Sequence, residues 1–125
     1  MNINDISYLI RGAAFEVFKT LGPGLLESVY EKALVFELIS KNLHVQTQVG
    51  IPVVYKEHDL DLGFRMDILV EDKVIMEFKS VELLHDVHKK QLLTYLKLAD
   101  KKLGILINFN TDSLLDKESL IRIIN

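Results

Sequence analysis

Three polar residues in two neighbouring segments have the types and spacing to do chemistry. Asp67 belongs to one stretch in which apolar and polar side chains alternate, and Glu77 and Lys79 belong to the next. Such alternation is typical of half-buried strands. A three-residue loop at 71–73 would keep the apolar side chains of both strands on one face, because directly opposed residues of an antiparallel pair share a face. That register predicts Asp67 directly opposite Glu77.

The same register makes further pairs, whereas a loop one residue shorter or longer would bury charge. The predicted pairs are Val70 with Val74, Ile68 with Met76, Met66 with Phe78, and Arg65 with Lys79.

Two facing carboxylates repel each other unless a proton or a cation lies between them. Lys79 follows Glu77 by two residues on the same strand face, so its ammonium group could balance the pair, hold a water or contact a phosphate oxygen. The spacing suits a hard divalent ion such as Mg²⁺, which takes carboxylate, carbonyl and water oxygens, and the Phe78 backbone carbonyl is a further candidate ligand. The alternative interpretation is an exposed hairpin with alternating charges, and spacing alone leaves both open.

Two helices are predicted before the hairpin. Apolar residues recur at helical spacing from Ile6 to Leu21, after a capping Asn4 or Asp5, and the segment Gly22-Pro23-Gly24 then forms a tight corner. A second helix is expected over residues 25–41, with Asn42 in the left-handed conformation that often follows a helix. We expect its inward residues to be Leu26, Val29, Ala33 and Phe36, and with Gly24 as the cap Glu27 takes the third helical position.

The remaining pattern predicts strands around one more helix. Strands are expected over residues 43–55, with an irregularity at 50–52, then over 60–70, 74–79 and 103–109. A helix over 85–99 places Gln91 and Tyr95 one turn apart and forms a right-handed crossover between the last two strands. Residues 114–124 are either an edge strand or a short helix. The expected fold is one α/β domain (α+β mixed) over residues 1–125, with element order ααβββαβ.

Several motifs of the chain resemble those of the GxxExxY protein family. They are Gly24-Leu25-Leu26-Glu27-Ser28-Val29-Tyr30, Arg65-Met66-Asp67-Ile68-Leu69-Val70, Glu77-Phe78-Lys79, Gln91-Leu92-Leu93-x-Tyr95-Leu96-Lys97 and Leu106-Ile107-Asn108-Phe109. That family is similar to the PD-(D/E)XK nuclease superfamily, so the resemblance implies a restriction-endonuclease-like mixed β-sheet flanked by helices. It also implies cleavage of phosphodiester bonds with Mg²⁺, or alternatively Mn²⁺.

The resemblance also assigns residues to roles. The Asp, Glu and Lys of the superfamily's motif correspond to Asp67, Glu77 and Lys79, and its acid on an upstream helix corresponds to Glu27. By position alone, Glu27 is an ordinary partner for a helix N-terminus. Met66 stands where the superfamily name has proline. Arg65, Tyr30, Gln91 and Tyr95 are expected to contact substrate or support the site, although Tyr30 could equally belong to the core.

Composition limits the partners. The net charge of −3 argues against coating nucleic acid by bulk charge, yet residues 73–102 hold seven basic and four acidic side chains and could face a polyanion. The sequence has no cysteine, no secretory signal at its start and no apolar stretch near the roughly 18 residues of a membrane span, so we expect a cytoplasmic protein without a membrane role. His85 and His88 lack a third ligand for zinc.

The sequence therefore predicts a metal-dependent nuclease. Asp67, Glu77 and Glu27 would hold the ion, Lys79 would position or help deprotonate the attacking water, and Lys89, Lys90 and Lys97 could approach the backbone of the nucleic acid, expected to be DNA. A homodimer would add clamping surface to so small a domain. The alternatives are a nuclease-fold module that binds nucleic acid or a protein without turnover, and a hydrolase of smaller phosphate esters.

Overall fold

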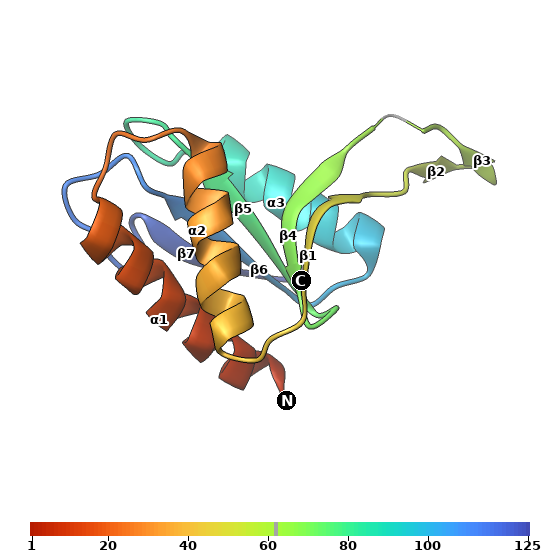
Figure 1. Ribbon diagram of the computed structural model, residues 1–125. Coiled ribbons are helices and arrows are strands. Elements are labelled where there is room, and N and C mark those ends of the chain that lie inside the picture. The colour runs from red at the N-terminus through yellow and green to blue at the C-terminus, as the bar shows by residue number, and fades with distance from the viewer. Residues whose placement is uncertain (62) are drawn as a thin grey trace.

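The computed structural model describes residues 1–61 and 63–125, and Figure 1 shows helices on both sides of a central sheet. In chain order the elements are α1 (Ile3–Leu21), α2 (Glu27–Ser40), β1 (Val45–Gly50), β2 (Val54–Tyr55), β3 (His58–Asp59), β4 (Arg65–Val70), β5 (Val74–Lys79), α3 (Asp86–Ala99), β6 (Leu103–Asn108) and β7 (Leu120–Ile124). The predicted mixed α+β fold class is confirmed.

Five strands form one mixed sheet in the order β1-β4-β5-β6-β7. Strands β5 and β6 pair in parallel and are joined by α3, as the predicted crossover requires, while the other neighbours pair antiparallel. Residues 120–124 form the edge strand β7, which decides between the two structures expected for the end of the chain. Strands β2 and β3 form a separate two-stranded sheet.

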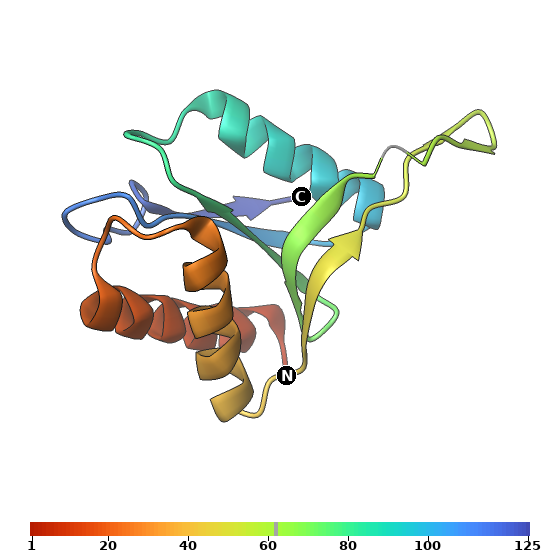
Figure 2. The same ribbon diagram turned by 45° about the horizontal axis from the view of Figure 1, so that its top comes forward.

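Each face of the sheet has its own apolar core, and Figure 2 shows the helix layers that cover the two faces. On one face α1 and α2 pack through residues such as Ile10 and Leu34 against Ile68 and Met76. On the other face Leu92 and Leu96 of α3 pack against Ile75 and Leu106. Because β5 lies in the middle of the sheet, its residues 74–78 are all buried.

Helix α2 presents a different face to the core from the one predicted. Tyr30, Leu34 and Leu38 are buried at a spacing of four residues, while Leu26 and Phe36 are 74% and 72% exposed. Of the predicted inward residues only Ala33 packs against the core, and Val29 is exposed as well. The helix is apolar on both sides, so its pattern does not say which stripe faces inward. The helix also starts later than expected: Leu26 is the N-cap, and Glu27 is the first helical residue rather than the third.

The helix ends near the N-terminus follow short-range rules. Asn2, rather than Asn4 or Asp5, caps α1, and its Oδ1 accepts a hydrogen bond of 2.8 Å from the amide of Asp5. Gly22 and Gly24 adopt positive φ angles of 68° and 99° at the predicted corner, and Asn42 adopts the expected left-handed conformation. No helix in the described part of the chain is long and apolar enough to cross a membrane.

The hairpin register is confirmed next to its loop and wrong further out. The pairs are Val70–Val74, Leu69–Ile75 and Ile68–Met76. Met66, however, packs in the core under α3, whereas Phe78 belongs to the core under α1 and α2, so these two residues do not share a face as predicted. Strand β4 changes face between Ile68 and Met66, and its neighbour β1 changes face with it at Gln48, whose φ is 51°.

Strand β4 is also shorter than predicted, since it begins at Arg65 rather than near residue 60. Leu60 and Phe64, expected on its inner face, are exposed, and Leu62 lies outside the described residues. The chain before β4 instead forms the small β2–β3 ribbon, which projects beyond the rest of the molecule in Figures 1 and 2.

Candidate active site

Asp67 and Glu77 lie directly beyond Ile68 and Met76, the last pair of residues in the register of β4 and β5. The Asp67 amide donates a hydrogen bond of 3.2 Å to Glu77 Oε1, and the Phe78 amide donates one of 2.9 Å to Asp67 Oδ2. Each carboxylate thus replaces a carbonyl as the acceptor for an amide of the neighbouring strand. The change of face in β4 turns the Asp67 side chain toward β5, so the two carboxylates come together, although not as the directly opposed pair of the predicted register.

Burial makes the Glu77 carboxylate costly to ionise. Glu77 is only 6% exposed, and desolvation, the charge of Asp67 and a side-chain hydrogen bond with Asp67 raise its pKa to about 9, against the smaller opposing effects of the Asp67 amide and Lys79. A carboxyl group in such a position carries a proton at neutral pH unless a cation replaces it. Perturbed acids of this kind are characteristic of functional sites.

Lys79 is held beside the carboxylates by α3. It follows Glu77 on β5, and its Nζ donates a hydrogen bond of 3.2 Å to Gln91 Oε1. Burial, and then the charges of Glu77 and Asp67, raise the pKa of the Tyr95 hydroxyl, while Gln91 lowers it. Gln91 and Tyr95 lie one turn apart on α3, as predicted, and Gln91 bonds Lys79.

Glu27 approaches the pair from the first turn of α2. Partial burial and the charge of Asp67 raise the pKa of its carboxyl group, while Lys79 and a hydrogen bond with the Ser80 backbone lower it. The contact with Ser80, which directly follows Lys79 at the end of β5, was not predicted from the sequence. Among residues 1–61 and 63–125, no three His, Asp or Glu side chains form a group that could hold a metal ion.

Two expected residues lie elsewhere. Arg65 Nη1 donates a hydrogen bond of 3.1 Å to the Gln48 carbonyl in β1, and Arg65 pairs with Gly50 rather than with Lys79. Tyr30 is buried, with its ring stacked on Phe109 at a centroid distance of 4.3 Å. Of the two roles left open for Tyr30, the structure gives it the one in the core.

Tyr30 nevertheless connects the core to Glu27. Its hydroxyl donates a hydrogen bond of 2.6 Å to the Gly22 carbonyl and accepts one of 3.2 Å from the Leu25 amide. These bonds fix the corner that leads into α2, and therefore the position from which Glu27 starts. Sequence reasoning missed this role, which the three-residue spacing of Glu27 and Tyr30 does not reveal.

His85 and His88 form a capping interaction at the N-terminal end of α3. The His88 Nδ1 accepts a hydrogen bond of 3.0 Å from the amide of His85, the N-cap residue. Desolvation, then Lys79 and His85, lower the pKa of His88. The Nδ1 atom of His88 is therefore engaged in capping the helix.

A mixed sheet flanked by helices, with two carboxylates and a lysine where its central strands separate, is the arrangement expected of a restriction-endonuclease-like nuclease fold. The family model described as the PD-(D/E)XK nuclease superfamily matches residues 4–123. The chain belongs to this superfamily. Comparisons with curated proteins and with solved structures gave no match.

Proposed function

We propose that this protein is a metal-dependent nuclease that hydrolyses phosphodiester bonds, with Asp67, Glu77 and Lys79 at its centre and Glu27 contributed by α2. The observation that carries the proposal is the pairing of a buried Glu77 with Asp67 beside Lys79. In a member of the PD-(D/E)XK superfamily, this combination of acids and a lysine is best explained by reaction with a phosphodiester.

The carboxyl pair fits a divalent cation by its chemistry. Asp67 and Glu77 supply hard oxygen donors, and burial, followed by the charge of Asp67, raises the pKa of Glu77 to about 9. Mg²⁺, or Mn²⁺ in its place, would be held by Asp67, Glu77 and the Phe78 carbonyl, with Glu27 reaching the ion directly or through a water. When bound, such an ion polarises a phosphoryl oxygen and makes a water more acidic.

The protein's own groups position the reactants. Lys79 donates to Gln91, so its ammonium is held in one direction and can hold the attacking water or a phosphate oxygen. Gln91 and Tyr95 present polar atoms on the same side and would contact the substrate next to the cleaved bond. Because the Glu77 proton must leave before a cation can bind, binding of the ion should release protons.

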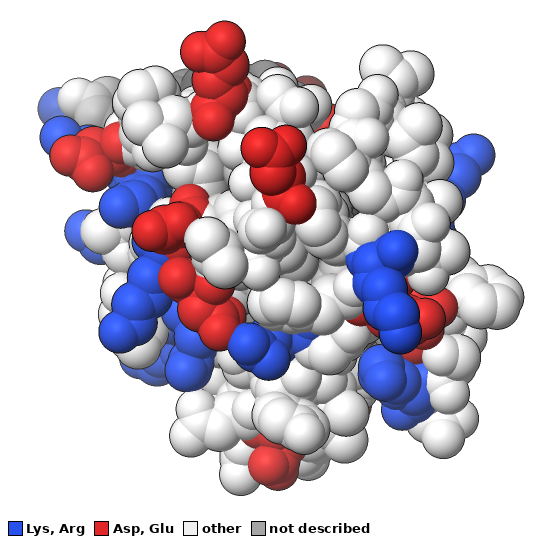
Figure 3. Space-filling view, turned by 90° about the vertical axis from the view of Figure 1, so that its left-hand side faces the viewer, with Lys and Arg blue, Asp and Glu red and all other residues white. Residues whose placement is uncertain are grey.

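Nucleic acid, with DNA as the expected form, is the substrate we propose. Its phosphates would meet the basic residues of α3, among which Lys90 and Lys97 are exposed. Figure 3 shows a face of the molecule on which basic and acidic side chains are interspersed with uncharged surface, so no continuous basic band covers that face. Affinity should therefore depend on a few contacts and fall with salt.

The direct test is cleavage of a plasmid and of a single-stranded oligonucleotide with Mg²⁺ or Mn²⁺. We compare the parent with Asp67→Asn, Glu77→Gln and Lys79→Ala, and with Glu16→Gln on the exposed side of α1 as the matched control. The proposal expects the control to cut like the parent and the other three to lose about 10²-fold or more of the rate. Equal cleavage by all five proteins would identify a contaminating nuclease.

The second candidate is a nuclease-fold module that binds nucleic acid or a protein without turnover. The observation in its favour is that no three-carboxylate group capable of holding a metal is formed in the described residues. Binding of a labelled oligonucleotide, measured against salt with and without Mg²⁺, separates the cases. A salt slope without any cleavage supports the module, whereas absence of binding leaves only a protein partner or a smaller phosphate ester.

We further propose that the chain is a member of the GxxExxY family and works as one cytoplasmic domain. The geometry of its motif supports the first point: Gly24 has a φ of 99°, Glu27 begins α2, and Tyr30 fastens the corner between them. Fractionation of the native cells, with detection of the protein in each fraction, would test the location.

A further inference from the structure

The β2–β3 ribbon makes few bonds to the rest of the molecule. We call residues 53–61 the arm. Its backbone pairs join Val54 to Asp59 and Tyr55 to His58, and a hydrogen bond of 2.9 Å links the Leu60 amide to the Val53 carbonyl. All of these lie within the arm. An isolated two-stranded ribbon is marginally stable in water, so an arm of this kind gains order when it packs against something.

The arm combines apolar and acidic side chains. Val54 and Tyr55 are 61% and 59% exposed, and Leu60 is also exposed. Glu57, Asp59 and Asp61 are its acids, against the single base Lys56, whose ammonium lies 5.4 Å from the Tyr55 ring centroid. This charge is unsuited to contact with nucleic acid, although the arm continues directly from the strands that carry the candidate site.

A groove elsewhere on the molecule has the complementary character. It has a volume of about 700 Å³ and lies between the start of α1, the β4–β5 turn and the strands β6 and β7. Its apolar lining includes Ile3, Leu103 and Ile124, and its cations are Lys73, Lys102 and Arg122. We call it the basic groove. Among the described residues, no acidic side chain lines it.

The cations of the basic groove have no carboxylate partner among the residues described. Lys73 Nζ donates to the Met1 carbonyl at 2.8 Å, and Arg122 Nη2 donates to Asn4 Oδ1 at 3.3 Å, but none of the three cations takes part in a salt bridge. Three acids on the arm thus match three bases in the groove, and the groove also offers apolar surface, chiefly from Ile124, which is 72% exposed, and from the half-buried Ile3. The apolar lining distinguishes the groove from a site for phosphate alone.

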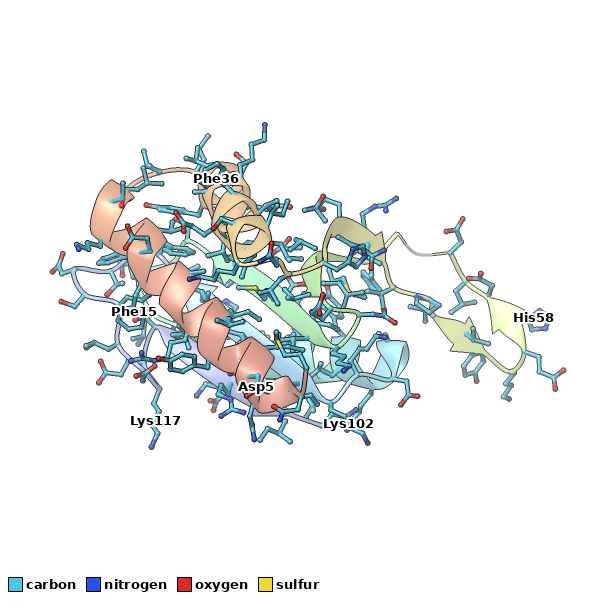
Figure 4. All side chains as sticks on the ribbon, turned by 60° about the horizontal axis from the view of Figure 1, so that its bottom comes forward. Asp5, Phe15, Phe36, His58, Lys102 and Lys117 are labelled. Carbon is cyan, nitrogen blue, oxygen red and sulfur yellow. The ribbon has the colours of Figure 1, made fainter. Side chains whose placement is uncertain are left out.

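The arm is placed to reach another molecule rather than its own groove. Figure 4 shows His58 at the tip of the arm, far to one side of the body, and Lys102 on the body near the start of α1. In Figures 1 and 2 the arm likewise extends away from the N-terminus, whose residues line the groove.

We propose that the arm of one copy of this chain docks in the basic groove of a second copy. Val54, Tyr55 and Leu60 lie against the apolar lining, while Glu57 and Asp61 face Lys102 and Arg122. The contact is small and charged, so the association is weak and weakens further as salt is raised. Reciprocal docking closes a dimer, and one-way docking extends a chain of copies. The carboxylate site takes no part in this inference.

The test is a charge exchange read by sedimentation velocity in low salt, from about 1 to 300 µM protein. The arm variant is Glu57→Lys with Asp61→Lys, which leaves Asp59 in place because its Oδ1 accepts a hydrogen bond from the Asp61 amide. The groove variant is Lys102→Glu with Arg122→Glu. Control variants are Glu16→Lys and Lys19→Glu, on exposed positions of α1. Circular dichroism and the urea midpoint verify that each variant is folded.

The parent and both controls should self-associate, and each exchanged variant should do so about tenfold or more weakly. A one-to-one mixture of the arm and groove variants should associate again, because every arm then meets a groove of opposite charge. A parent that stays monomeric at 300 µM overturns the proposal, and so does failure of the mixture to associate. The proposal is also overturned if the groove variant loses oligonucleotide binding while its association is unchanged, since the groove would then serve nucleic acid.

Discussion

Asp67 and Glu77 are joined through the backbone as well as by proximity: the Asp67 amide donates to Glu77 Oε1 at 3.2 Å, and Asp67 Oδ2 accepts from the residue after Glu77 at 2.9 Å. Both carboxylates are therefore fixed in place by bonds that do not depend on a metal. Without a bound cation this arrangement of Asp67 and Glu77 is unfavourable, because the two carboxyl groups lie close together and Glu77 is buried. The predictions about metal and pH follow from this relationship.

Divalent metal should stabilise the folded protein. A ligand that binds only the folded state at 100 times its Kd adds about 2.7 kcal/mol to the free energy of unfolding. We expect Mn²⁺ and Mg²⁺ to raise the Tm of the parent by several degrees, and to do so far less for Asp67→Asn and Glu77→Gln. Differential scanning fluorimetry measures this, with Glu16→Gln as the control. Identical shifts in all four proteins would mean that the ion binds elsewhere.

Without metal, the stability of the protein should fall as the pH rises. The pKa of Glu77 is about 9 in the folded protein and 4.5 as the ordinary value, so the folded state binds the extra proton between these limits. The stabilisation is complete below pH 4.5 and is lost progressively toward pH 9. Glu77→Gln keeps the neutral form, and should be more stable than the parent by roughly 1–3 kcal/mol at pH 7 in EDTA. Urea unfolding at pH 5, 7 and 8.5 measures the difference, which should grow with pH; a constant difference would contradict the assignment.

Tyr30→Phe should weaken the site without removing the ring from the core. The substitution deletes the bonds to Gly22 and Leu25 but keeps the stacking on Phe109. We expect a loss of about 1–2 kcal/mol in the free energy of unfolding, since two backbone groups lose their partner. If Tyr30 positions Glu27, the affinity for Mn²⁺ also falls, and calorimetry measures it. The exposed Tyr8→Phe is the control, and unchanged metal affinity in Tyr30→Phe would limit Tyr30 to a role in folding.

The parts that sequence predicted well depend on neighbours along the chain. The register of Val70 with Val74 follows from a three-residue loop and the alternation beside it, and α3 follows from its helical period, so both were predicted correctly. The prediction that Asp67 and Glu77 lie close together was correct, but the register behind it does not extend to them, and the change of face in β4 brings the two side chains together instead.

The parts that sequence missed depend on contacts between distant segments. The change of face at Asp67 occurs together with a positive φ at Gln48 in the neighbouring strand, which no pattern within β4 reveals. The bond from Lys79 to Gln91 depends on how α3 lies over the sheet. The alternation around Leu60 and Phe64 resembled a strand, but both side chains are exposed and lie between the β2–β3 ribbon and the start of β4.

Opposite faces of α2 should respond very differently to truncation. Leu34 is fully buried, so Leu34→Ala should lower the free energy of unfolding by about 2–5 kcal/mol. Phe36 is 72% exposed, so Phe36→Ala should change it by less than about 0.5 kcal/mol. Chemical denaturation measures both. The reverse order would restore the inward face predicted from the sequence alone.

Gly104 lets α3 approach the sheet closely. A Cβ atom on this residue of β6 would lie 2.8 Å from Leu92 Cγ, with both Leu92 Cδ atoms at 2.9 Å, so α3 or the Leu92 side chain must move to admit it. Gly104→Ala should therefore lower the free energy of unfolding by about 1–3 kcal/mol. Gly12→Ala is the matched control, because nothing lies within 4 Å of its added Cβ in α1, where alanine stabilises a helix by roughly 0.5–1 kcal/mol relative to glycine. Urea unfolding should show a lower free energy of unfolding for Gly104→Ala and a higher one for Gly12→Ala than for the parent. Because α3 also carries Gln91 and Tyr95, Gly104→Ala should in addition reduce cleavage, whereas Gly12→Ala should not. Equal stability of the two variants would show that the Leu92 side chain moves aside for the added Cβ atom without destabilising the protein.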